Sequence, residues 1–233
     1  MPRSVSLSAC RRFIGGSFRP GTRALALLCS LTIALGLVAD QAGGPWAPPL
    51  VSLWVWACLP LLFRHSPHES RGLLACLAIA TLGEAVLSLA WGLYDYRDGS
   101  IPLFVPPGHV MLYWLGLQLA PRLPGWLHRA IPPLALLGVT GLALAGRDGL
   151  GPALLLIFLA CMRWGPAPRL YTSMFLLSLL MELWGTWLGN WHWAAQVPGL
   201  GWPLANPPLA AGVFYCVLDL LAGLVRRPQA QPA

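Results

Sequence analysis

Residues 72–94 read GLLACLAIATLGEAVLSLAWGLY, an apolar stretch in which Glu84 is the only acidic residue. The hydrocarbon core of a bilayer is about 30 Å thick, so a helix needs about 20 apolar residues to cross it. This stretch is long enough. It predicts a membrane-spanning helix that carries a carboxyl group between its ends, and it places the chain among the all-α membrane proteins.

The composition of the whole chain agrees with this class. Of the 233 residues, 57% are hydrophobic and 10% are charged, and the mean hydropathy is +0.64. A soluble domain carries about 25% charged residues, so lipid must be the solvent for much of this chain. The 15 basic residues, all arginines, are scattered between apolar runs. We therefore expect no nucleic-acid partner, because nucleic-acid binding requires a basic face.

Seven further apolar runs accompany the first, and together they predict a polytopic protein with about eight transmembrane helices. The expected ranges are 24–39, 50–63, 72–94, 103–120, 130–146, 150–163, 170–189 and 203–225. Several runs are shorter than about 20 residues, so we expect the second and sixth to be tilted, extended or re-entrant.

The arginines lie in alternate loops, and this pattern sets the orientation of the helices. Thirteen of the 15 fall in the two termini and in the second, fourth and sixth loops, whereas Arg97 and Arg147 lie in other loops. Short arginine-rich loops stay cytoplasmic. We therefore expect residues 1–23 and 226–233 to be cytoplasmic tails of a multi-pass protein of the cell (inner) membrane.

The two halves of the chain, residues 24–120 and 121–225, resemble each other. The first contains EAVLSLAWGLYDY from Glu84 and the second contains ELWGTWLGNWHW from Glu182, so a glutamate precedes a glycine and an aromatic-x-aromatic pair in each. Because four helices return the chain to its original side, we predict two parallel four-helix repeats related by an axis along the membrane normal. The two glutamates should then lie at matching depth in the outer half of the bilayer.

Three acids fall inside the expected helices: Glu84, Glu182 and Asp219. An ionised carboxylate at a helix centre costs about 2.5–3.5 kcal/mol on insertion scales. We therefore expect an internal cavity in which at least one carboxyl is protonated and the others are hydrogen-bonded. A carboxyl that is neutral near pH 7 is a capable proton donor, so these acids are candidate catalytic groups. The structural alternative is a protonated glutamate bonded to a neighbouring backbone or tyrosine.

Two proline-rich segments, residues 106–109 and 206–208, are expected to open the fourth and eighth helices. Proline is tolerated in the first helical turn, so helix initiation, with Asn206 as N-cap, explains these segments structurally. A helix that begins at membrane depth also directs N–H groups into a cavity. His109 is then a candidate proton shuttle, and Asn206, Tyr113 and Tyr215 are candidate substrate contacts.

Four aromatic residues lie where helices leave the bilayer, namely Tyr94, Tyr96, Trp191 and Trp193. A belt of aromatic side chains at the membrane interface is one explanation. The other is an aromatic lining of the cavity that binds substrate and stabilises a carbocation through the ring quadrupoles.

Several site types are not indicated by the motifs. The sequence has no HxxxH or HExxH spacing, no P-loop, no GxSxG and no DxxxD helix. We therefore expect no metal and no cofactor. The six cysteines are widely separated, and five of them lie inside apolar runs, which favours small buried side chains over disulfides.

The segment from Glu84 to Pro102 (E-x7-G-x-Y-x-Y followed by I-P) and the segment from Gly189 to Asn206 (G-x-W-x-W followed by P-L-x-N) together resemble a family of carotenoid-biosynthesis membrane proteins. The family includes carotenoid 1,2-hydratases and, more distantly, small integral-membrane lycopene cyclases. The resemblance implies protonation of a polyene double bond, followed by capture of the cation by water or by ring closure, with Glu84 and Glu182 as the matching acids. The family more often has an aspartate at the position of Glu182.

Three functions are compatible with these residues. The first is a cofactor-independent hydratase- or cyclase-type enzyme that uses Glu84 and Glu182 as acid and base on a lipid-soluble isoprenoid or another lipid. The second is a proton-coupled transporter of a small molecule or lipid, because membrane-embedded acids also carry protons in transporters. The third is a non-catalytic membrane assembly subunit. The expected partner is a membrane lipid or lipid-soluble small molecule, and self-association into a homo-oligomer is left open.

Overall fold

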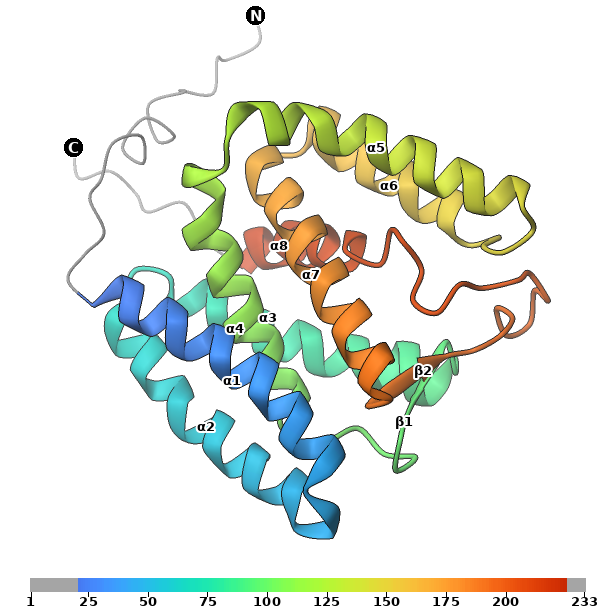
Figure 1. Ribbon diagram of the computed structural model, residues 1–233. Helices are drawn as coiled ribbons and strands as arrows, with labels where there is room; N and C mark the ends of the chain where they lie inside the picture. Colours follow the sequence, from blue (N-terminus) through green and yellow to red (C-terminus); the bar gives the residue numbers. More distant parts are fainter. Residues whose placement is uncertain (1–20, 226–233) are drawn as a thin grey trace, which may run out of the picture.

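A computed structural model of the protein describes residues 21–225, and these residues are mostly helical (Figure 1). The eight α-helices of this part are α1 (Thr22–Ala42), α2 (Ala47–His65), α3 (Ser70–Glu84), α4 (Val105–Leu119), α5 (Gly125–Leu144), α6 (Gly151–Trp164), α7 (Pro168–Leu188) and α8 (Val213–Val225). Most of the two expected tails, together with Cys10, lies outside the described residues.

Four helices are long and apolar enough to cross a membrane: Thr22–Ala42, Gly44–His65, Ser70–Ala90 and Gly125–Leu144. The second of these combines a short 3-10 turn (η2, Gly44–Trp46) with α2, and the third combines α3 with a π-helical turn (η3, Ala85–Ala90). Helices α6 and α8 are shorter but apolar. The predicted mostly helical fold is thus confirmed and the four apolar helices fit the predicted membrane protein, whereas the count of eight spans stays a prediction.

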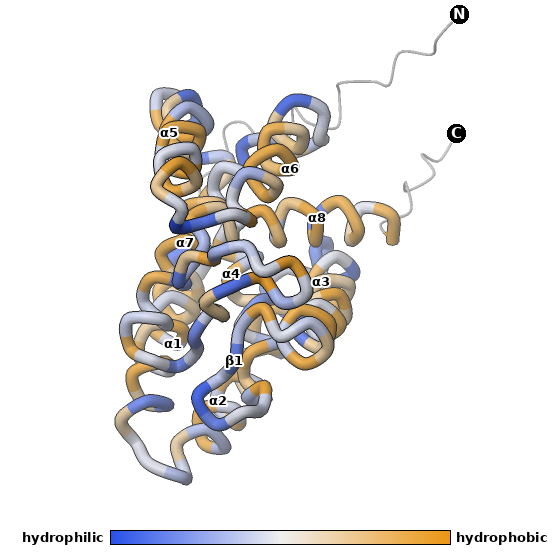
Figure 2. Tube along the Cα trace, turned by 90° about the vertical axis from the view of Figure 1, so that its right-hand side faces the viewer, coloured by the Kyte–Doolittle hydropathy of each residue, from blue (hydrophilic) through white to orange (hydrophobic). Residues whose placement is uncertain are grey.

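The hydropathy of the surface fits this class as well. Many large apolar side chains on the outer faces of the helices are exposed, including Leu134 and Leu137 on α5 and Leu156 on α6. Figure 2 shows hydrophobic residues along much of the helices and hydrophilic residues near turns and helix ends. A soluble protein rarely leaves so many large apolar groups in contact with water, so this surface fits a protein whose helices are surrounded by lipid.

The eighth helix differs from the expectation, because α8 begins at Val213 and not near residue 203. Proline removes a backbone donor and disfavours helical backbone in the residue before it, and the segment contains Pro203, Pro207 and Pro208. Asn206 is therefore not a helix N-cap. Its side-chain oxygen instead accepts a hydrogen bond from the backbone N–H of Trp193, at 3.1 Å.

Two short strands connect the halves of the chain. Strand β1 (Tyr94–Tyr96) follows α3 and its π turn, and strand β2 (Trp191–Trp193) follows α7. The strands pair antiparallel with Tyr94 opposite Trp193 and Tyr96 opposite Trp191. The pairing holds the ends of α3 and α7 together (Figure 1).

Polar contacts tie further helix ends to these paired strands. The backbone N–H of Arg97 donates to the carbonyl of Asn190, and the Arg97 guanidinium donates to the carbonyl of Asp40 at the end of α1. The amide of Asn190 donates to the Asp40 carboxyl, at 2.8 Å. The carboxyl ends of α1 and α7 therefore meet beside β1.

Candidate functional site

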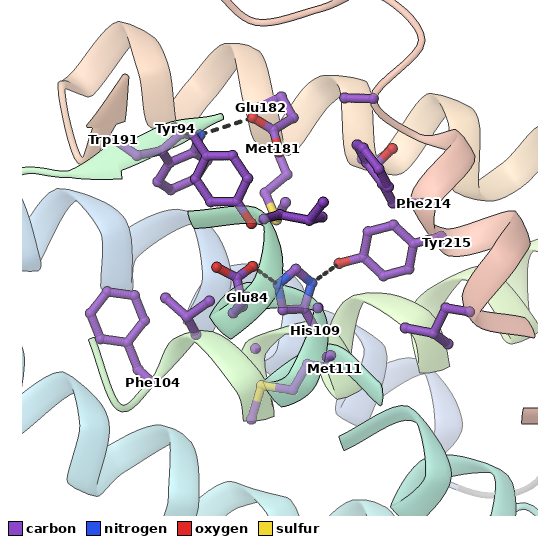
Figure 3. A pocket seen from close by; sticks show the side chains of 18 of the residues that line it. Glu84, Tyr94, Phe104, His109, Met111, Met181, Glu182, Trp191, Phe214 and Tyr215 are labelled. Atoms are coloured by element: carbon purple, nitrogen blue, oxygen red, sulfur yellow. Dashed lines mark hydrogen bonds and ion pairs between the residues drawn. The ribbon is translucent and has the colours of Figure 1, made fainter. Parts of the chain in front are cut away.

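One cavity of about 360 Å³ lies among α1, α2, α3, α4, α7 and α8, with the paired strands also in its wall. Most of its lining is aliphatic or aromatic. The ionisable or hydroxyl-bearing side chains that line it are Thr32, Glu84, Tyr94, Tyr96, His109, Ser178, Glu182 and Tyr215. Figure 3 shows Glu182 on one side of this cavity and the row Glu84, His109 and Tyr215 on the other, with the Tyr94 ring between the two glutamates.

Glu84 is held by hydrogen bonds to both carboxyl oxygens. Its Oε1 contacts His109 Nε2 at 2.8 Å, and its Oε2 accepts the hydroxyl of Tyr96 at 2.8 Å. His109 Nδ1 lies 2.5 Å from the Tyr215 hydroxyl. Burial, together with the neighbouring Glu84 carboxyl, raises the pKa of Tyr96, so its hydroxyl remains a proton donor to Glu84. The resulting row Tyr215–His109–Glu84–Tyr96 joins α8, α4, α3 and β1.

The ionised form of Glu84 fits these contacts best. Both oxygens meet groups that can donate, and a carboxylate accepts such bonds without offering a donor of its own. A carboxylate facing Nε2 places the imidazole proton on that nitrogen, which leaves Nδ1 of His109 to accept the hydroxyl proton of Tyr215.

Glu182 has a different set of partners. Its Oε2 accepts two indole N–H groups, from Trp191 at 2.8 Å and from Trp193 at 2.9 Å. Its Oε1 has no hydrogen-bond partner among the described residues, and the Glu182 side chain lines the cavity. An indole only donates, so both contacts suit an oxygen that carries no proton. When this carboxyl is neutral, its proton must therefore be on Oε1.

The four aromatic side chains of the strands form the wall between the glutamates. Tyr94 and Trp193 have ring centroids 4.8 Å apart, and Tyr96 and Trp191 have centroids 6.1 Å apart. Each side chain is buried. They therefore pack as a cavity lining and do not form an exposed belt at the ends of the helices.

Two local features bring these groups together. The α-helical backbone of α3 changes to a π turn directly after Glu84, which shifts the exit of the chain toward β1. On α7, the Trp191 ring lies against Gly185, where an added Cβ would come within 1.9 Å of the indole. Glycine at this position therefore lets the indole reach Glu182. Gly83 and Gly108 have open space beside them and leave room in the cavity.

Asp219 lies in a separate buried cluster. Its Oδ1 accepts a short hydrogen bond from the Tyr113 hydroxyl, and its Oδ2 accepts the Tyr171 hydroxyl at 3.3 Å. His109 and Tyr113 are one turn apart on α4, as Tyr215 and Asp219 are on α8. The second cluster therefore lies one helical turn beyond the first, and neither Asp219 nor Tyr113 lines the cavity.

Of the predicted site residues, eight thus line one cavity, whereas Asp219, Tyr113 and Asn206 lie elsewhere. No sequence pattern singles out the apolar residues that complete the wall, which are Phe104, Met111, Met181 and Phe214. Apolar residues in an apolar helix carry no local signal for facing a cavity rather than lipid. The cysteines at positions 29, 58, 76, 161 and 216 are buried, in agreement with the prediction.

Within residues 21–225, no group of three or more His, Cys, Asp or Glu side chains is arranged to hold a metal ion. Comparisons of the chain with family models, with curated proteins and with solved structures find no match. The function must therefore be argued from the site itself.

Proposed function

We propose that the chain crosses the cell membrane eight times, with both termini cytoplasmic, as two parallel four-helix repeats. Counted from Ser70, Glu84 is the fifteenth residue of the 21-residue span Ser70–Ala90, and counted from Pro168, Glu182 is the fifteenth residue of the 21-residue α7. The matching positions support equal depth. A reporter fused to the C-terminus should be active only in its cytoplasmic form, and an external signal would overturn this orientation.

The strand pairing also supports the repeat. The sequence motif matches Tyr94 with Trp191 and Tyr96 with Trp193, yet the observed pairs are Tyr94 with Trp193 and Tyr96 with Trp191. Tyr94 therefore pairs with the counterpart of Tyr96, and Tyr96 pairs with the counterpart of Tyr94. This exchange is the reciprocal pattern that a two-fold axis between the halves produces. Relative to the second half, the first has one extra residue between its glutamate and its glycine, and a π turn is how a helix accommodates a single added residue.

We propose that this site is the acid–base centre of an enzyme that acts on a neutral, lipid-soluble isoprenoid or similar lipid. The observation that carries the proposal is the pair of carboxyl groups with unlike partners in one apolar cavity. Two titratable groups whose surroundings favour opposite protonation states define an acid and a base. Glu182 is the acid, and Glu84, acting with His109 and Tyr215, is the base.

The reaction begins with transfer of the Glu182 proton to one carbon of a double bond, which leaves a positive charge on the adjacent carbon and a carboxylate on Glu182. The rings of Tyr94 and Trp193 stabilise this charge. The cation then loses a proton from a neighbouring C–H bond, or water adds and loses a proton. Tyr215 accepts that proton while it passes its own to His109 Nδ1, and Glu84 stabilises the imidazolium. Return of the proton to Glu182 completes the cycle.

The experiment that tests this proposal is lipid extraction and mass analysis of cells with and without the gene, repeated with Glu84→Gln and Glu182→Gln. We expect one lipid-soluble compound to accumulate and another to disappear when the gene is deleted or either glutamate is replaced. Identical lipid and pigment profiles in all strains would overturn the proposal that the protein is an enzyme.

The Asp219 cluster favours one alternative, a proton-coupled transporter. It places a third buried acid beyond the cavity, as a route through the membrane would need. Proteoliposomes with an imposed pH gradient distinguish the two functions. Proton flux that requires Asp219 and a transported compound would favour transport, whereas a chemical change in lipid without flux would favour the enzyme. If neither proton flux nor a chemical change in lipid is observed, the remaining function is that of a non-catalytic assembly subunit.

A further inference from the structure

Three residues that line the cavity are also exposed on the outside of the protein. Leu82 and Val86 on the α3 span are 65% and 47% exposed, and Leu221 on α8 is 44% exposed. Every other lining residue is buried or half-buried. The two helices contact each other, so these side chains mark a single opening between them. Because Ser70–Ala90 is long and apolar enough to span a membrane, the opening faces hydrocarbon.

The opening leads directly to the reacting groups. Gly83 lies between Leu82 and Glu84 and presents no side chain, and an added Cβ there would meet no atom within 4 Å. No side chain therefore closes the cavity wall at Gly83. A chain that enters between Leu82 and Leu221 meets no side chain at position 83.

The size of the cavity limits what it can hold. Its volume of about 360 Å³ is at the lower end of the roughly 300–1,000 Å³ typical of small-molecule sites. A long hydrocarbon chain therefore does not fit inside as a whole. One end can occupy the cavity while the remainder leaves through the opening into the lipid.

The lining also argues against a charged head group. Among the described lining residues, His109 is the only basic side chain, and it is already paired with Glu84. Within residues 21–225, no arginine lines the cavity to bind a phosphate, and burying an unpaired phosphate in an apolar cavity is costly. The end that enters the cavity is therefore neutral.

We propose that the substrate is a neutral chain longer than the cavity, which enters laterally from the bilayer between α3 and α8 with its apolar end first. Leu82, Val86 and Leu221 contact the part of the chain that remains outside the cavity. The inference rests on the proposed function for the chemistry, but the access route can be tested without any turnover.

The test uses the full-length protein in lipid nanodiscs and two photoreactive derivatives of geranylgeraniol, one with the diazirine at the hydrocarbon end and one with it in mid-chain. After illumination, mass spectrometry maps the labelled residues. We expect the end-labelled probe to mark Met111 and Met181 inside the cavity. The mid-chain probe should mark Leu82, Val86 or Leu221.

Val86→Trp and Leu221→Trp obstruct the opening and should lower cavity labelling by about tenfold. The matched controls are Leu89→Trp and Leu220→Trp, which are neighbouring exposed positions that do not line the cavity. These controls should label like wild type. A phosphatidylcholine that carries the diazirine in its head group should mark only outer surfaces.

Cavity labelling that is unchanged in both obstructed variants would overturn lateral access. Phosphatidylcholine that labels the cavity as strongly as the geranylgeraniol probe does would overturn the proposal that the entering end is neutral. The outcome is separable from that of the proposed chemistry. If the probe reaches the cavity through the opening but Glu182→Gln leaves cellular lipids unchanged, the route holds and the enzyme does not. If the lipids change but the obstructed variants behave like wild type, the enzyme holds and the route does not.

Discussion

Glu84 and Glu182 occupy the same position along their helices and face the same cavity, yet their oxygens have different partners. Glu84 contacts an imidazole and a phenol through separate oxygens, whereas Glu182 receives both of its indole donors on one oxygen. The first arrangement suits a carboxylate and the second leaves one oxygen available to carry a proton. In the proposed mechanism, two acids at matching positions thus acquire opposite roles through their neighbours.

The largest expected effect comes from Glu182→Gln. The glutamine oxygen can still accept the two indole N–H groups, so the fold should be retained, but an amide is not an acid. We expect product formation to fall by about 10²–10⁴-fold, the usual contribution of a positioned proton donor. The measurement is product per folded protein in cell lipid extracts. Glu69→Gln, at the remaining glutamate of the chain and outside the cavity, is the control. Wild-type turnover in Glu182→Gln would remove this residue from the mechanism.

The second effect concerns His109. His109→Leu leaves the Oε1 of the Glu84 carboxylate without its imidazole N–H donor, and leaving a buried acceptor without its hydrogen bond costs about 1–3 kcal/mol. We expect that decrease in the free energy of unfolding, measured by denaturation in sodium dodecyl sulfate. Adding Glu84→Gln should restore part of it, because a neutral amide costs less to bury. If Glu84→Gln instead deepens the loss, Glu84 is not a carboxylate in the native protein.

The third prediction compares two glycines. At Gly185, an added Cβ would overlap the Trp191 ring, so Gly185→Ala should displace this donor from Glu182 and cost about 1–3 kcal/mol. At Gly108 no atom lies within 4 Å, so Gly108→Ala should be neutral or stabilise α4 by up to about 1 kcal/mol. Thermal unfolding in detergent measures both. Equal effects would show that close packing on Gly185 does not position the indole.

The smallest effect is the coupling between Tyr96 and Glu84. A hydrogen bond to a charged group contributes about 1.5–3 kcal/mol and one between neutral groups about 0.5–1.5 kcal/mol. Tyr96→Phe should therefore cost about 1 kcal/mol less when Glu84 is already replaced by glutamine. A double-mutant cycle measures this difference. Zero coupling would contradict the ionised form of Glu84.

Much of the fold was predictable from apolar runs, because each helix must present a long hydrophobic surface to lipid. The eighth helix was placed too early because its preceding segment is apolar but contains three prolines. The segment before α8 also packs closely at Gly212, where an added Cβ would come within 2.7 Å of the Phe175 backbone. Hydropathy measures how readily a segment enters lipid and not whether its backbone can be helical.

The site was predictable to a different degree. The matched motifs around Glu84 and Glu182 placed both acids and four aromatic residues together, because a repeated pattern implies repeated geometry. The bonds of His109 to Glu84 and Tyr215 depend on how α3, α4 and α8 pack, which no local pattern records. Asp219 was grouped with the other acids by residue type alone, and one helical turn separates it from the cavity.

The central claim is that Glu182 is protonated and Glu84 ionised in the resting protein at neutral pH. Infrared spectra of protein with ¹³C-labelled glutamate test it, because the chain has only the glutamates Glu69, Glu84 and Glu182, and the isotope shift separates them from aspartate. We expect one isotope-shifted carboxylic-acid C=O band that disappears in Glu182→Gln and persists in Glu84→Gln. A band that disappears in Glu84→Gln and persists in Glu182→Gln would contradict the assignment of acid and base.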